Sequence, residues 1–375
     1  MTRPRTLPKE VTAVNDNYPL RFAYDFLPSL MLRDREFGHK IDLMKSVGVS
    51  TVWLDCYLTG EWDASLEDIA KCRRILMDEG FEVQALNAPL GHGSQALDPS
   101  QPLAFQTGDG WSNRVDCCGN PWPSTTCVDD KCIADSRKVL ESLREIGFTR
   151  VFYDDDLRMG VWGPHMQGCF CDRCMKRFGD RHPQYAGLSR LEIVEKSRSD
   201  PALADAWMTM QCDSILRFLD ETTPEGMTPN FMIMHNGDRR HGLDITRMKQ
   251  HFPDAYFRIG EGHFGDGSFL HPLGRDGITH SIKKQMRLVG DVSKTWSETT
   301  TYPVGDLSPA NFVEKMRIEI GCGLRNIFLM SGTVFLFDEY WHAVRDALPE
   351  LSELAASTSL PDLSVPYEDD FVWHL

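Results

Sequence analysis

The stretch VLESLREIGFTRVFYDDD, residues 139–156, contains the signals that decide the fold of this chain. Its first half has apolar residues at every third or fourth position, which is typical of an amphipathic helix. Gly147 follows where helix ends favour glycine, and residues 150–154 then form a short apolar run typical of a buried strand. The segment DEGFEV, residues 78–83, repeats this joint between a helix and a strand. The chain is therefore expected to alternate helices with strands.

Eight apolar runs of this kind predict eight strands, at residues 20–26, 51–56, 82–87, 150–154, 231–235, 255–260, 293–297 and 326–331. The clearest helices are expected between them, at residues 65–79, 131–146, 204–220, 309–321 and 339–355. Eight alternating units favour an α/β fold with a single closed (β/α)₈ TIM barrel. A doubly wound open sheet is the alternative, and the lack of a G-x-G-x-x-G motif after the first strand disfavours it.

Two predicted connections, residues 88–126 after the third strand and 155–203 after the fourth, are much longer than the usual two to six or so residues. Both follow the carboxyl ends of strands, which form the active face of such barrels. They are therefore expected to build a substrate site, and the alternative is that they cover an oligomer interface. No linker or change of composition divides the chain. Residues 1–375 are thus expected to form one domain, with residues 1–18 as an N-terminal extension.

The composition excludes several classes of protein. The 375 residues are 41% hydrophobic and 25% charged, as in ordinary globular proteins. The formal net charge of −15 repels phosphate backbones, so nucleic acid is not an expected partner. No apolar run reaches the roughly 18–20 residues of a transmembrane helix, and no secretory signal is visible, so no membrane partner is expected. Eleven cysteines, seven of which lie between 117 and 174, indicate reduced cytoplasm and metal ligation rather than a disulfide framework.

The motif C-x-C-x₂-C, formed by Cys169, Cys171 and Cys174, is the sharpest signal for a metal site. Three thiols within six residues can converge on one soft cation, and tetrahedral zinc needs a fourth ligand. Cys127 is the preferred fourth ligand because it lies in a loop before the helix that precedes the fourth strand. Cys132 and the pair Cys117–Cys118 are the alternatives. A closed site of four cysteines would be structural rather than catalytic.

Three consecutive carboxylates, Asp154, Asp155 and Asp156, follow the fourth strand. Strand alternation sends Asp154 and Asp156 to one side and Asp155 to the other, so at least one is expected to face the barrel mouth. Burial beside like charge raises the pKa of a carboxyl group, which suits a general acid. Arg158 is positioned to pair with one of the others. A helix cap with solvated loop acids is the alternative interpretation.

Glu298 follows the seventh strand beside Trp296, where a carboxylate nucleophile would be held rigidly. Nearly every other strand also ends in polar or ionisable side chains: Asp25, Asp55, Asn87, His92, His235, Asn236, Asp238, Glu261, His263 and Asp266. Indoles in neighbouring loops, which suit stacking on sugar rings, are those of Trp62, Trp111, Trp122 and Trp162. Carboxylates and indoles around one cleft favour glycoside chemistry.

With these residues the chain resembles the catalytic barrel of the family 42 β-galactosidases and of uncharacterised glycoside-hydrolase-like proteins related to them. In that family, a cysteine before the helix that precedes strand four and a C-x-C-x₂-C after strand four form a zinc site. Cys127, Cys169, Cys171 and Cys174 match this order. The segment 338–355 also resembles the last helix of such barrels.

The resemblance implies that Asp156 is the acid/base, with Asp155 where the family has an asparagine, and that Glu298 is the nucleophile. Three departures accompany it. An aspartate replaces the family's acid glutamate, the asparagine that binds the sugar 2-hydroxyl is absent, and the accessory domains after the barrel are missing. The resemblance therefore implies glycoside chemistry but not β-galactosidase activity.

Together these features predict a retaining glycoside hydrolase that acts on a carbohydrate through Glu298 as nucleophile and Asp156, or as second choice Asp155, as acid/base. The expected substrate-binding residues are Asp25, Asn87, Arg158, His235, Asn236, Glu261 and Trp296. A homo-oligomer is left open. One alternative is a non-catalytic sugar-binding barrel. Another is a metal-dependent isomerase or lyase barrel whose cation is held by Glu261, His263, His235 and Asp266.

Overall fold

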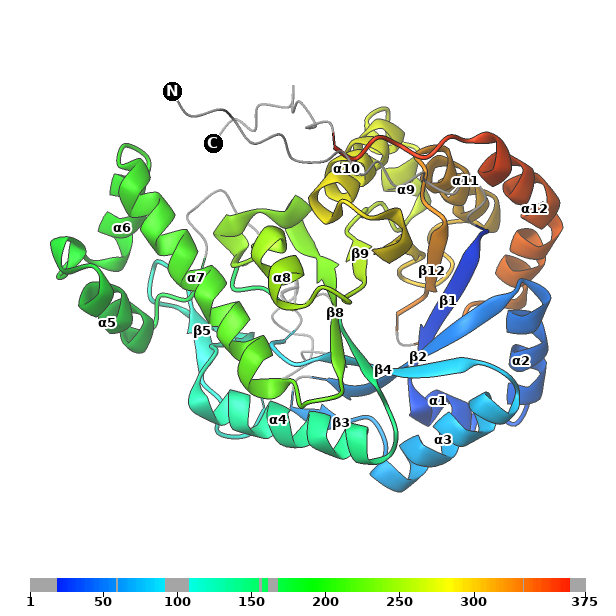
Figure 1. The fold of residues 1–375 in the computed structure, drawn as a ribbon, viewed down its shortest axis with the longest axis horizontal. Helices are drawn as coiled ribbons and strands as arrows, with labels where there is room; N and C mark the ends of the chain where they lie inside the picture. Colours follow the sequence, from blue (N-terminus) through cyan, green and yellow to red (C-terminus); the bar gives the residue numbers. More distant parts are fainter. Residues whose placement is uncertain are drawn as a thin grey trace, which may run out of the picture.

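The computed structural model describes residues 19–58, 60–91, 108–154, 157–160, 168–332 and 334–364, without the side chains of Pro123, Ser124 and His235. Eight parallel strands of this part of the chain form a closed barrel, and helices surround it (Figure 1). In order around the barrel they are β1 (Arg21–Phe26), β2 (Val49–Leu58), β4 (Glu82–Ala88), β7 (Arg150–Tyr153), β8 (Thr228–Ile233), β9 (Phe257–Ile259), β10 (Thr295–Trp296) and β12 (Asn326–Met330). The strand β1 pairs with both β2 and β12, which closes the ring. The predicted (β/α)₈ barrel is confirmed.

Most of the helices cover the outside of the barrel with an apolar face, and two of them lie beside the barrel (Figure 1). They are α1 (Pro28–Arg33), α2 (Phe37–Ser46), α3 (Leu66–Asp78), α4 (Asp130–Glu145), α5 (Asp172–Arg181), α6 (Arg190–Ser197), α7 (Pro201–Thr222), α8 (Ile245–His251), α9 (Asp266–Phe269), α10 (Gly274–Val289), α11 (Pro309–Gly321) and α12 (Asp338–Ser357). The predicted helix at 309–321 matches α11 at both ends. The predicted helix at 204–220 instead begins at Pro201, because Asp200 caps the amides of Ala202 and Leu203.

Aromatic rings fill the inside of the barrel. The Trp53 ring of β2 lies 5.5 Å from that of Phe152 in β7 and 6.4 Å from that of Phe328 in β12, measured between centroids. Side chains from three strands therefore meet at the barrel axis, and the interior is a packed core rather than a pore.

The two long predicted connections contain structure of their own. The first includes the hairpin of β5 (Asn113–Val115) and β6 (Pro121–Thr126), and the second includes α5 and α6. These two helices lie beside the barrel, at the left of Figure 1, and pack on the first turns of α7. Their own small apolar cluster is separate from the barrel core and centres on Phe170, Phe178 and Trp207. The second connection is thus a small helical extension of the barrel.

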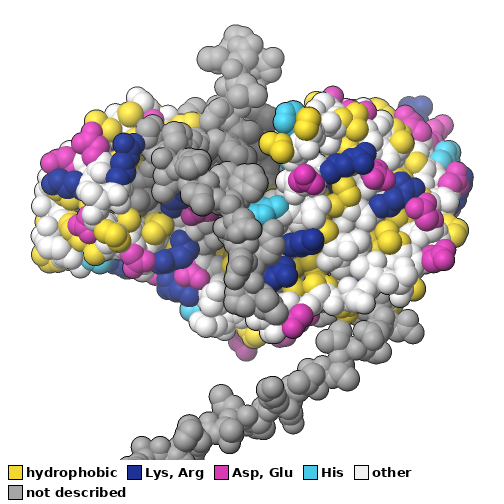
Figure 2. Space-filling view, turned by 90° about the horizontal axis from the view of Figure 1, so that it is seen from above, with side chains coloured by type: hydrophobic (Ala, Val, Ile, Leu, Met, Phe, Trp, Pro, Cys, Tyr) yellow, Lys and Arg dark blue, Asp and Glu magenta, His cyan; other side chains and the backbone are white. Residues whose placement is uncertain are grey.

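The surface has no strongly basic area on the face that Figure 2 shows, where acidic and basic side chains of the described residues are mixed. Among the described helices, none combines the length and the apolar character that a membrane span requires. The predicted N-terminal extension, residues 1–18, lies outside the described residues.

Candidate functional site at the carboxyl ends of the barrel strands

The centre of the candidate site is Arg258, which points from β9 into the barrel and is 1% exposed. Its guanidinium carbon lies 5.2 Å and 5.3 Å from the ring centroids of Phe152 and Phe328. The guanidinium donates a hydrogen bond to the carboxylate of Asp154, directly after β7, and its Nη2 lies 3.9 Å from Oε1 of Glu298. One buried cation thus joins carboxylates from two parts of the barrel.

Glu298 lies where the seventh barrel strand is interrupted. The strand β10 ends at Trp296, and the short strand β11 (Thr299–Thr300) resumes the pairing with β12. The Oε2 atom of Glu298 accepts hydrogen bonds from the amides of Glu261, at 2.7 Å, and Gly262, at 3.2 Å. In return, the amide of Glu298 donates to Oε1 of Glu261 at 3.1 Å. These reciprocal bonds fix the orientation of the Glu298 carboxylate.

Lys315 of α11 holds the same loops from behind and is completely buried. Its Nζ donates to the carbonyl oxygens of Glu298, at 2.7 Å, and Gly262, at 2.9 Å, and lies 3.5 Å from Oε2 of Glu261. One turn further along, Glu319 accepts a hydrogen bond from the Thr299 hydroxyl at 2.7 Å. Burial, with Glu261 nearby, raises the pKa of Glu319 well above its usual range. A buried polar network therefore ties α11 to the candidate site.

Two further carboxyl groups, those of Asp25 and Asp55, share the barrel interior. Asp25 is the register partner of Trp53, and Asp55 lies two residues beyond Trp53 on the same inward side of β2. Burial is the main cause that raises the pKa of both groups well above the usual range. The negative charge of Asp154 adds to the rise for both, and the charge of Asp25 adds to it for Asp55. Arg258 opposes this rise but does not cancel it.

The proposed acid/base residues, Asp155 and Asp156, lie outside the described residues, as do His92 and Trp162. Arg158 is buried beside His241. Burial, together with the charge of Arg158, lowers the pKa of His241 to about 3. Asn236 accepts a hydrogen bond from Gln285 at 3.0 Å, and nothing is described of the His235 side chain.

Three of the predicted substrate-binding residues do not lie where their side chains would reach a substrate at the carboxyl ends of the strands. Trp296 is 2% exposed, and its ring lies 5.1 Å from the guanidinium of Arg21, the first residue of β1. The prediction for Trp296 is therefore wrong, because this ring fills the amino end of the barrel. Asn87 is the register partner of Tyr153, whose ring packs on Phe218 of α7, so this register places Asn87 on the helix side of β4.

Glu261 is the third corrected residue. Its carboxylate accepts the amide of Glu298 and pairs with Lys315, so it holds the loop rather than a substrate hydroxyl. Sequence reasoning also missed Arg258 and Lys315. The available signal was a charge inside an apolar strand, in AYFRIG at 255–260, and a lysine on the apolar face of the helix at 309–321.

Among the described residues, which do not include the side chain of His235, the proposed ligands of the alternative catalytic metal site have other partners. Asp266 accepts hydrogen bonds from the amide of Ser308 and the side chain of Asn311, both at 2.8 Å, and so anchors the start of α11. The His263 ring instead contacts the carbonyl oxygen of Ser268 at 3.1 Å. In the part of the chain that the structure describes, the four cysteines are the one group of three or more potential ligands that could hold a metal ion.

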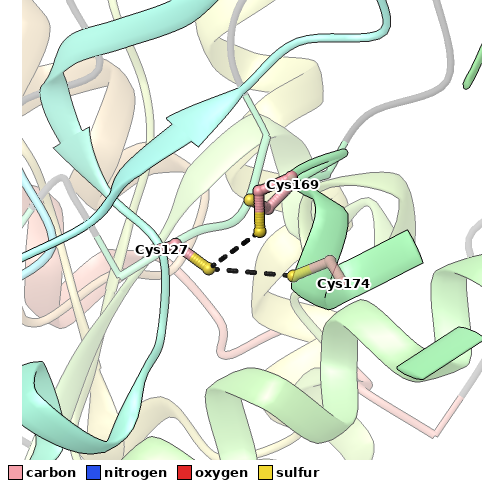
Figure 3. A group of neighbouring side chains, drawn as sticks. Cys127, Cys169 and Cys174 are labelled. Carbon is pink, nitrogen blue, oxygen red and sulfur yellow. Dashed lines mark hydrogen bonds between the residues drawn. The ribbon is translucent and has the colours of Figure 1, made fainter. Parts of the chain in front are cut away.

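The cluster of Cys127, Cys169, Cys171 and Cys174 joins the hairpin β5–β6 to the start of α5. Figure 3 shows the thiols of Cys127, Cys169 and Cys174, which point toward one another. All four sulfur atoms lie within 4.8 Å of one another. The sulfur of Cys127 is 3.8 Å from that of Cys171 and 3.7 Å from that of Cys174. Tetrahedral thiolates at the usual zinc–sulfur distance of about 2.3 Å are about 3.8 Å apart, so the cluster fits a metal ion.

The cluster also has an outer partner. Arg173 donates to the sulfur of Cys127, at 3.5 Å, and to Asp129, at 3.1 Å. Cys127 is thus the fourth member that the spacing favoured, and Cys132, Cys117 and Cys118 are not part of the group.

The comparisons with known proteins show a fold and no sequence family. No protein-family model and no curated protein matches the sequence. A GH5_18 protein from Streptomyces cattleya, solved with GlcNAc, has a similar fold with a TM-score of 0.51 and 10% identity, over 92% of this chain and 82% of that chain. Two variants of a GH36 α-galactosidase from Geobacillus stearothermophilus, solved with 1-deoxygalactonojirimycin and with raffinose, give TM-scores of 0.44 and 0.47 at 12% identity. This chain spans 43% of the length of each of those two chains. The likeness to the GH5_18 structure concerns the fold alone.

Proposed function

We propose that this protein is a retaining glycoside hydrolase whose barrel is related to the catalytic barrels of family 42. The observation that carries the proposal is the fixed Glu298 carboxylate beside Arg258 at the carboxyl ends of the strands. Two main-chain amides hold Oε2 of this carboxylate, and Oε1 lies 3.9 Å from Nη2 of Arg258, so the group has a fixed orientation, as a nucleophile requires. Asp154 is engaged by Arg258, which leaves Asp155 and Asp156 for the acid/base role.

In this mechanism Glu298 forms a bond to the anomeric carbon while the bond from that carbon to the leaving oxygen breaks. Asp156 gives its proton to that oxygen. A water molecule then loses a proton to Asp156 and attacks the same carbon, and the bond to Glu298 breaks. This sequence requires the two carboxyl groups to stand about 5–5.5 Å apart. Arg158, His235 and Asn236 remain candidates for binding substrate hydroxyls.

The test is hydrolysis of a panel of aryl glycosides, in both anomeric forms, by the full chain. We expect turnover of one anomeric series, and we expect proton NMR of the first product to show the same anomeric configuration as the substrate. Inversion would contradict the retaining mechanism. If no glycoside of the panel is hydrolysed, the non-catalytic sugar-binding barrel is favoured.

We further propose that the four-cysteine cluster binds one structural Zn²⁺ ion. The wild-type chain is expected to hold about one zinc per chain, measured by elemental analysis. The Cys174→Ser variant should lose this zinc and become more sensitive to limited proteolysis between residues 168 and 200, because α5 loses its link to Cys127.

The control for this prediction is Cys118→Ser, since Cys118 is exposed and outside the cluster. It should retain the zinc and the wild-type digestion pattern. Equal zinc in wild type and Cys174→Ser would contradict the assignment.

The cysteines also bear on location. All eleven are free, as expected in a reducing compartment. We therefore propose that the protein, as a single domain, works in the cytoplasm.

A further inference from the structure

Asp25 and Asp55 each carry a buried oxygen atom that has no hydrogen-bond partner among the described residues. The residues are 3% and 6% exposed, and in both the unpartnered atom is Oδ1. Leaving a buried acceptor unpaired costs a fold stability. Two such atoms on the neighbouring strands β1 and β2 therefore point to donors that the described residues do not supply.

The two buried cations near this pair, Arg258 and Lys315, are directed at other groups. Arg258 donates hydrogen bonds to Asp154 and to the sulfur atoms of Met232 and Met330, and it approaches Glu298. The Nζ atom of Lys315 donates to the carbonyl oxygens of Glu298 and Gly262. Within the described ranges, no lysine or arginine forms an ion pair with Asp25 or Asp55. Asp25 and Asp55 lie in the barrel interior with Glu298, but their Oδ1 atoms receive no hydrogen bond from the described residues.

We propose that Asp25 and Asp55 form a subsite that hydrogen-bonds two neighbouring hydroxyl groups of a terminal sugar ring. This inference rests on the proposed function and deepens it, because it makes the substrate a chain end. A carboxyl group that keeps its proton both donates and accepts a hydrogen bond, as a hydroxyl does, whereas an ammonium group only donates. The raised pKa of both groups agrees with this pairing.

The position of the pair explains why the ring is terminal. Asp25 stands level with Trp53, whose ring meets those of Phe152 and Phe328 across the barrel. These rings fill the barrel at the level of Asp25, and Asp55 lies two residues nearer the carboxyl end of its strand. A sugar that reaches Asp25 and Asp55 enters a dead end, so a residue inside a glycan chain has no exit for its second neighbour.

The first test measures binding and not turnover. The probes are galactose, glucose, mannose and xylose, and binding to the full chain is followed by saturation-transfer NMR and calorimetry. We expect at least one to bind. Binding should weaken about tenfold in Asp25→Leu and Asp55→Leu, which lose a hydrogen bond, and change little in Asp25→Asn and Asp55→Asn, which keep a donor and an acceptor. The control Asp42→Asn changes an exposed residue of α2 and should bind as wild type does.

The outcomes separate this subsite from the proposed function. Sugar binding that depends on the pair, without turnover of any glycoside, supports the subsite and contradicts the hydrolase. Turnover with binding unchanged in both leucine variants overturns the subsite alone. Failure of all four sugars to bind wild type overturns it, and so does tighter binding of glucosamine or galactosamine that the asparagine variants abolish, because the pair would then recognise a cation.

A second test uses stability. The groups that face the pair are Asp154, Asp63 and Arg258. Because the folded-state pKa of each group lies above its unfolded value, the folded protein binds more protons, and stability falls as pH rises from about 4 toward the folded pKa. Asn does not titrate. Asp55→Asn should therefore unfold at a higher denaturant midpoint than wild type at pH 7, with the difference vanishing below about pH 4. A lower midpoint at pH 7 would indicate a structural role instead.

Discussion

Glu298→Gln is expected to lower kcat/KM for the glycoside that the wild type hydrolyses by roughly 10⁴-fold. The reason is chemical and not structural. The amide oxygen of glutamine still accepts the hydrogen bonds of the Glu261 and Gly262 amides, so the loop keeps its position. The negative charge that attacks the anomeric carbon is lost. The measurement is initial rates for wild type and variant, with thermal unfolding of both.

The matched control is Glu350→Gln, which removes a carboxylate charge from α12, where it pairs with Arg317 at 2.7 Å. It should retain wild-type rates. A Glu298→Gln protein that keeps full activity would remove Glu298 as nucleophile. A variant that loses activity together with its cooperative unfolding would show that the carboxylate stabilises the fold instead.

Lys315→Met is expected to lower the free energy of unfolding by about 3–5 kcal/mol, the usual cost of leaving one partner of a buried ion pair unpaired. The substitution removes both hydrogen bonds to the carbonyl oxygens of Gly262 and Glu298. It also leaves Glu261 and Glu319 buried without their cation. Chemical denaturation at pH 7 measures the difference.

Two further variants locate the cause of this loss. Lys45→Met removes an exposed pair with Glu79, so it should change the free energy of unfolding by no more than about 1 kcal/mol. The double variant Lys315→Met with Glu261→Gln should recover part of the loss, because the buried charge disappears with its partner. No recovery would show that the carbonyl contacts of Lys315, rather than its charge, provide the stability.

The barrel could be predicted because its signals are local. Apolar periodicity and helix-ending glycines place each strand and helix, and the helix at 309–321 agrees with α11 at both ends. The four-cysteine cluster was also predictable, since three of its members lie within six residues. The strand ends could be identified in the same way, which is why Asp25 and Glu298 were singled out.

The side-chain directions could not be predicted. Residues 293–297 read as one strand, but the regular strand β10 ends at Trp296, and this short strand places the ring at the amino end of the barrel. Arg258 and Lys315 were missed because a single charge in a strand or helix usually faces water. Their carboxylate partners come from other strands and loops, and that proximity exists only in the folded chain.

The two amides that hold Glu298 belong to the main chain at Glu261 and Gly262. An alanine scan of residues 260–264 leaves both amides in place, so it would report the contribution of the Glu261 side chain and miss that of the two main-chain donors. Gly262 has a φ of 66°, and alanine there would strain the backbone without deleting the donor. Replacing the amide of residue 261 or 262 by an ester, through chemical synthesis or ligation, deletes one donor and keeps every side chain. The orientation of Glu298 therefore depends in part on main-chain donors that no side-chain substitution removes.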